Sequence, residues 1–107
     1  MAMCWVRAGQ CGKETSIAAR KVDPTHVVFE IATTCERVQA LADELGEVDV
    51  AHEMSCPLIE TRVYTLATQH MCRNSCIVPA AILKTLEVTG GIFLPGDAGI
   101  EFVEGAI

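Results

Sequence analysis

Six cysteines are the residues of this 107-residue chain whose type and spacing could do chemistry. A thiolate binds soft metals and acts as a nucleophile, and a helix N-terminus favours the thiolate because its free N–H groups and dipole attract negative charge. Cys11 lies in a loop flanked by glycines, Cys35 in the first turn of an expected helix, and Cys76 three residues before Pro79 at the start of another. These three are the leading candidates for ligands of a metal ion or cluster.

Two nearby residues are candidates for a further ligand. Cys72 lies four residues before Cys76 and His70 lies two residues before Cys72, and both residue types bind zinc and iron. Cys4 falls in an apolar segment and is interpreted as core packing, while Cys56 is left undecided. Burial as a small apolar side chain is the alternative for every cysteine.

The positions of these cysteines depend on the elements around them. Alternating or β-branched segments at Met3–Ala8, Thr15–Val22 and His26–Ile31 predict three strands. Gly9–Gly12 is the first connection, and Asp23-Pro24-Thr25 is typical of a turn. Because the connections are short, the simplest arrangement of the three strands is an antiparallel meander.

Helical periodicity follows the strands. Thr33 and Glu36 have the spacing of a capping box, and Gly46 is expected to end the first helix. Pro57 is expected to open a second helix and Pro79 a third. In each expected helix one stripe of residues faces the core. In the first helix the stripe is Cys35, Val38, Leu41, Ala42 and Leu45. In the second it is Ile59, Val63, Leu66 or Ala67, and His70, and in the third it is Ile82, Leu83 and Leu86.

The order of strands and helices indicates an α+β single domain over residues 1–107, with about three helices packed on one face of the meander. Glu47–Met54 has no clear period and is left as ambiguous, extended structure. Ile92–Leu94 and Ile100–Val103 flank a Pro-Gly-Asp turn and predict a short C-terminal hairpin. The core is expected to be aliphatic, with Phe29, Phe93 and Phe102 as its bulky members.

The composition limits the classes of partner. The chain carries 14 acidic and 8 basic residues, a net charge of −6, so we expect no nucleic-acid binding. No apolar run approaches the ~18 residues of a membrane span, and Met1–Arg7 lacks the features of a signal peptide. We therefore expect a cytoplasmic protein with reduced thiols, no membrane association, and a protein partner or a second copy of itself.

The order and settings of three cysteines resemble the iron–sulfur cluster assembly scaffold family, the NifU/IscU-type fold, over roughly residues 3–90. The matching segments are Cys11-Gly12 after the first strand, Cys35 after Val27-Val28-Phe29-Glu30-Ile31, and Cys76 leading into Val78-Pro79-Ala80-Ala81-Ile82-Leu83-Lys84. The resemblance implies that these three cysteines hold an iron–sulfur cluster or zinc. The chain also looks like small cysteine-containing proteins of anaerobic microbes, which implies no activity.

Three functions stay open. The leading hypothesis is a small metal- or iron–sulfur-binding protein, for which a non-catalytic role is favoured and enzyme activity stays open. The second is a thiol redox protein or thiol enzyme in which Cys35 is the catalytic nucleophile and another cysteine resolves it. The third is a structural or interaction domain with inert buried cysteines that forms oligomers through its apolar surface.

Overall fold

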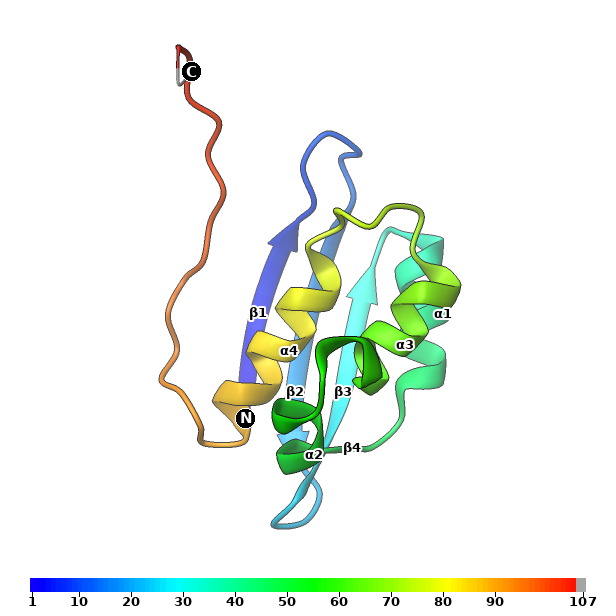
Figure 1. Ribbon diagram of the computed structural model, residues 1–107, viewed down its shortest axis with the longest axis vertical. Coiled ribbons are helices and arrows are strands. Elements are labelled where there is room, and N and C mark those ends of the chain that lie inside the picture. Colours follow the sequence, from blue (N-terminus) through cyan, green and yellow to red (C-terminus); the bar gives the residue numbers. More distant parts are fainter. Residues whose placement is uncertain (106–107) are drawn as a thin grey trace.

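The computed structural model describes residues 1–105 and has a four-stranded antiparallel sheet in the order β1-β2-β3-β4 (Figure 1). The strands are β1 (Ala2–Arg7), β2 (Glu14–Lys21), β3 (His26–Thr33) and β4 (Val48–Asp49). The α+β class and the three-stranded meander are confirmed. The short strand β4 adds an edge that the ambiguous pattern of Glu47–Met54 did not reveal.

Strand alternation separates a covered face of the sheet from an open one. The pairing Cys4–Ile17–Ile31 lies on the covered face, and the neighbouring pairing Met3–Ala18–Glu30 lies on the open face. Helix α1 (Glu36–Leu45) packs on β3, and α4 (Val78–Thr89) packs on β1 and β2. Helix α3 (Arg62–His70) packs against both helices, so the helices lie on one face, as expected (Figure 1).

The core between sheet and helices is aliphatic, as the composition predicts. Its fully buried side chains are Ile17, Val27, Val38, Leu41, Leu45, Val63, Val78, Ile82 and Leu86. Phe29 packs against this cluster, but Phe93 and Phe102 are exposed, so the prediction that they belong to the core is wrong. Both phenylalanines follow α4, the last helix that covers the sheet.

The first helix starts later than the capping-box pattern suggests. Strand β3 continues through Thr33, whose hydroxyl bonds with Thr15 across the strands, so Thr33 is extended and cannot cap the helix. Cys35 is the N-cap residue instead. The predicted end is confirmed, because Gly46 follows Leu45 with a positive φ of 62°.

The predicted helix from Pro57 is also wrong in its start. Pro57 precedes a single 3₁₀ turn, Leu58–Glu60, and α3 begins only at Arg62. The break arises because the Thr61 side chain accepts a hydrogen bond from the Tyr64 N–H at 3.1 Å and so caps α3. Ile59, expected on the inner stripe, is therefore 80% exposed.

A further short helix, α2 (Val50–Ser55), follows β4, so the extended structure expected over Glu47–Met54 is found only at Val48–Asp49 and is wrong from Val50 onward. Its Glu53 is buried, and the two carboxylate oxygens accept hydrogen bonds from the N–H groups of Arg62 and Val63 at 2.8 and 2.9 Å. Helix α2 thus satisfies the first free N–H groups of α3.

The predicted C-terminal hairpin does not form. Residues 90–105 contain no strand, and the apolar side chains of both predicted arms are exposed. A two-stranded hairpin is marginal unless one face packs on another layer, and α4 already covers the adjacent side of the sheet. The segment instead runs away from the body as an extended tail (Figure 1).

The turn between β2 and β3 confirms the Asp23-Pro24-Thr25 signal. Asp23 Oδ1 accepts hydrogen bonds from the N–H groups of Thr25 and His26, both at 2.8 Å, and lies 3.1 Å from His26 Nδ1. The Thr25 N–H is the main reason that the Asp23 pKa falls to about 2. The hydrogen bond with Asp23 in turn raises the pKa of His26.

We therefore expect Asp23→Asn to lower the pKa of His26 toward its ordinary value of 6.5, because the amide keeps the turn but removes the charge. A pH titration of the His26 ring protons by NMR measures this change. Glu47→Gln is the control and should cause a smaller fall, since Glu47 is the weakest contributor to the shift. An unchanged His26 midpoint in Asp23→Asn would contradict the prediction.

The sign of the accompanying stability change follows from the raised pKa. Protonated His26 stabilises the fold fully below its unfolded pKa, and this contribution is lost as pH rises through the folded pKa. The free energy of unfolding of the wild-type protein should therefore fall as the pH rises through the folded pKa of His26. In Asp23→Asn this fall should be smaller.

Candidate cysteine site

The fold brings three cysteine-bearing connections to one end of the molecule. Strands β1 and β3 run in the same direction because each is antiparallel to β2, so the β1–β2 loop and the end of β3 share one end of the sheet. Cys11 lies in that loop and Cys35 follows β3. The α3–α4 connection, with Cys72 and Cys76, lies at the same end (Figure 1).

Cys11 projects from a tight turn. The Gly12 N–H donates to the Gly9 carbonyl at 2.9 Å, and the two glycines have φ values of 74° and 96°, which other residues rarely adopt. The Ala8 N–H closes the loop on the Lys13 carbonyl at 3.2 Å. Cys11 is exposed at the tip, so its thiol is accessible to a ligand.

Cys35 is partly buried at the start of α1. Its N–H donates to Thr33 Oγ1 at 3.1 Å and its carbonyl accepts from the Gln39 N–H at 3.0 Å. The thiol makes no capping hydrogen bond, so the backbone alone fixes the residue at the helix N-terminus. The position matches the expectation that Cys35 lies beside the free N–H groups of a helix.

Cys76 is partly buried just before α4, and Cys72 is exposed four residues earlier. Burial is the main cause that raises the pKa of the Cys76 thiol, and the Val78 N–H opposes it by hydrogen bonding. Charge on the thiols of Cys72, Cys35 and Cys11 raises the pKa further, in that order.

His70 is directed to a different partner. Its imidazole Nε2 pairs with the Glu44 carboxylate, and its carbonyl accepts from Arg37 at 3.4 Å. Glu44 is in the last turn of α1, about 13 Å along the helix from Cys35. The ring of His70 is therefore paired with the last turn of α1, whereas its carbonyl contacts Arg37 in the first turn, two residues after Cys35.

The other two cysteines lie outside this end of the molecule. Cys4 Sγ is 3.1 Å from Thr85 Oγ1 and packs against the core. Cys56 is the C-cap residue of α2, and its N–H donates to the His52 carbonyl at 3.0 Å. Cys4 and Cys56 are therefore suitable control positions for the four candidate ligand cysteines.

The four candidate cysteines do not form a coordination shell in this structure. Within residues 1–105, no three Cys, His, Asp or Glu side chains lie close enough together to hold a metal ion. The donor set is all thiol, which suits zinc or an iron–sulfur cluster chemically. A shared ligand would require the three connections to approach one another.

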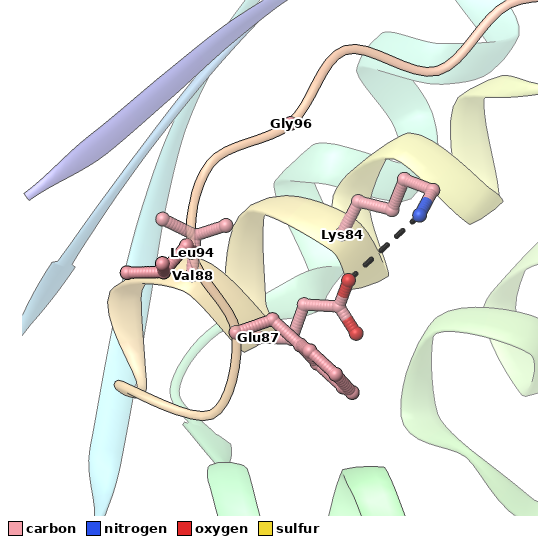
Figure 2. Close-up of a pocket in the computed structure, with 6 residues that line it drawn as sticks. Lys84, Glu87, Val88, Leu94 and Gly96 are labelled. Carbon is pink, nitrogen blue, oxygen red and sulfur yellow. Dashed lines mark ion pairs between the residues drawn. The ribbon is translucent and has the colours of Figure 1, made fainter.

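An open cleft of about 400 Å³ lies at the far end of α4 from Cys76. It is lined by Lys84, Glu87, Val88, Phe93, Leu94 and Gly96. Figure 2 shows the Lys84–Glu87 ion pair, at 3.8 Å, on one side and Leu94 beside Val88 on the other. The sequence did not reveal this cleft, because residues 92–103 had the pattern of a hairpin.

Along residues 1–105, no helix is both long enough and apolar enough to cross a membrane. A search of curated proteins and a search of solved structures each returned no significant match. The model of a family of unknown function, DUF6951, matches residues 2–102, and the chain therefore belongs to that family.

Proposed function

We propose that this protein binds a soft metal ion or an iron–sulfur cluster through Cys11, Cys35 and Cys76, with Cys72 as the fourth ligand. The observation that carries the proposal is that three cysteine-bearing chain connections lie at the same end of the sheet (Figure 1). Two of these thiols are exposed and two partly buried, so a bound ion would be reached from solvent on one side.

The choice of Cys72 as fourth ligand rests on its neighbours. Cys72 lies four residues before Cys76 in the same α3–α4 connection, and its side chain is exposed. His70 is already paired with Glu44. An all-cysteine ligand set suits a structural zinc site or a [2Fe–2S] or [4Fe–4S] cluster.

Binding of a shared ion would bring the β1–β2 loop, the β3–α1 junction and the α3–α4 connection closer together. Cys11 sits on an exposed turn with glycines at both ends, whereas Cys35 and Cys76 are fixed at the starts of α1 and α4. The approach of Cys11 toward the two helix starts costs less than moving a packed helix. The Val78 N–H at the start of α4 lowers the pKa of Cys76 by hydrogen bonding and so opposes the effect of burial.

The raised pKa of Cys76 supports a ligand role over a nucleophilic one. A thiol that burial keeps protonated is a poor nucleophile at neutral pH, but a metal ion displaces its proton on binding. The resemblance to iron–sulfur scaffold proteins supports the same three ligands.

Anaerobic titration with Co²⁺, Zn²⁺, or Fe²⁺ plus sulfide tests the proposal. We expect one ion or cluster per chain, with thiolate-to-cobalt charge-transfer absorption in the Co²⁺ form. Cys35→Ser and Cys76→Ser should abolish the stoichiometric binding, while Cys4→Ser and Cys56→Ser, the matched controls, should retain it. Circular dichroism verifies that each variant is folded. Absence of stoichiometric binding, or equal binding by all four variants, would refute the proposal.

Metal affinity should rise with pH, because the Cys76 thiol must lose a proton that burial holds in place. Between about pH 6 and pH 8 we expect roughly a tenfold gain in apparent Zn²⁺ affinity per pH unit for each proton released. Calorimetry in buffers of different ionisation enthalpy measures how many protons are released when the metal binds. Affinity that is independent of pH would show that thiols are not the ligands.

A further inference from the structure

The C-terminal tail, residues 92–105, carries apolar side chains that its own fold leaves uncovered. The tail starts from a fixed point, because the N–H groups of Ile92 and Phe93 donate to the Glu87 carbonyl at 2.9 and 3.3 Å. Figure 2 shows Leu94 beside Val88 and the chain running on past Gly96. Beyond that point Ile100, Phe102 and Val103 are exposed, Phe102 by 98%.

Strand β1 offers a matching surface. It pairs with β2 alone, and among the described residues no backbone hydrogen bond reaches its outer edge. Its Met3 and Trp5 are exposed on the open face of the sheet, Trp5 by 62%. A six-residue edge with apolar side chains and no proline is a template for pairing with another strand.

The two regions have opposite charge although the whole chain is acidic. The β1–β2 hairpin, residues 1–21, contains four of the eight basic residues and one acidic residue, whereas residues 90–105 contain three acidic residues and no basic one. The basic residues are Arg7, Lys13, Arg20 and Lys21, and the acidic residues of the tail are Asp97, Glu101 and Glu104. This distribution favours contact between tail and hairpin.

We propose that the tail of one copy docks as an added strand on the β1 edge of a second copy, and that the exchange is reciprocal. Ile100 and Phe102 are two residues apart, so they share one side of an extended segment and would cover Trp5 and Met3 of the second copy. A reciprocal exchange closes as a twofold dimer and leaves no free tail.

The tail leaves the β1 strand of its own chain uncovered. Met3 and Trp5 stay exposed, and so do Ile100 and Phe102. Both surfaces are therefore free to pair with a second copy. In the structure it runs along the β1 side at a distance, without covering that strand (Figure 1).

Sedimentation velocity on the full chain, in reducing buffer to prevent disulfides, tests the proposal over about a thousandfold range of concentration. We expect a monomer–dimer equilibrium that weakens about 30-fold in Phe102→Ser. The control is Ile59→Ser, which replaces another strongly exposed apolar residue, outside both surfaces, and should leave the equilibrium unchanged. Higher salt should weaken the dimer several-fold, because opposite charges meet.

Trp5 is the single tryptophan, so the fluorescence of the protein reports whether this side chain is covered. Its emission should shift to the blue as the dimer forms, and the shift should be lost in Phe102→Ser at the same concentrations. A chain that stays monomeric throughout, or a dimer that Phe102→Ser leaves intact, would overturn the proposal. A blue shift that is independent of concentration would also overturn it, because it would mean that the tail folds back on its own sheet.

Discussion

Glu53→Ala is expected to lower the free energy of unfolding by about 3 kcal/mol. Glu53 is only 3% exposed, and its two oxygens accept hydrogen bonds from the Arg62 and Val63 N–H groups at 2.8 and 2.9 Å. Alanine leaves both N–H groups without their partner at the start of α3 and opens a small cavity. Each unsatisfied buried donor costs roughly 1–3 kcal/mol.

Urea denaturation followed by circular dichroism measures this loss, with two comparison variants. Glu53→Gln has one acceptor oxygen in place of two and should have an intermediate stability. Glu60→Ala removes an exposed acid from the neighbouring 3₁₀ turn and should change stability by less than about 0.5 kcal/mol. If Glu53→Ala were as stable as Glu60→Ala, the carboxylate would not be what joins α2 to α3.

Ile82→Ala should destabilise the fold by about 3–4 kcal/mol, since the side chain is 0% exposed in the middle of α4. Its removal deletes buried methylene groups and leaves a cavity between the helix and the sheet, because surrounding side chains close such a space only in part. Helix α4 begins two residues after Cys76, so the same change loosens the element that positions this cysteine.

Thermal and urea unfolding of Ile82→Ala should be compared with two milder changes. Ile82→Val deletes one methyl group and should cost about 1 kcal/mol. Leu94→Ala, in the exposed tail, should have nearly wild-type stability. Equal stabilities for Ile82→Ala and Leu94→Ala would contradict the packing of α4 on the sheet.

The meander could be predicted because its signals are local. Strand alternation and the Asp23-Pro24-Thr25 turn lie within a few residues of one another, and the structure follows them. Helix α2 could not be predicted in this way, since distant residues fix it. The Val50 N–H donates to the Thr25 carbonyl at 3.0 Å, and Glu53 is held by residues nine and ten positions later.

The candidate site shows the same division between local and tertiary information. Antiparallel connectivity is enough to predict that Cys11 and Cys35 lie at one end of the sheet. The direction of His70 depends on how α3 packs against α1, and its partner Glu44 is 26 residues away. No periodic pattern in the sequence encodes that pairing, so His70 could not be separated from the cysteines beforehand.

The C-terminal tail shows a limit of apolar patterns. Alternation in Ile100–Val103 is typical of a strand, but a strand needs a partner edge and a layer to cover. In the same chain the outer edge of β1 is unpaired, but the tail leaves it uncovered and Trp5 stays exposed. The pattern is therefore better interpreted as a strand whose partner is another molecule, which is the basis of the exchange proposed above.

The packing of α4 on the first two strands also constrains the synthesis of the protein. Cys4 and Thr85, which hydrogen-bond in the folded chain, are 81 residues apart. While the ribosome is still making the chain, the meander can pair, but the covered side of β1 and β2 has no helix until α4 has emerged. A nascent or prematurely terminated chain that ends before Val78 thus presents bare apolar strands, which makes it a substrate for chaperones and a source of aggregation.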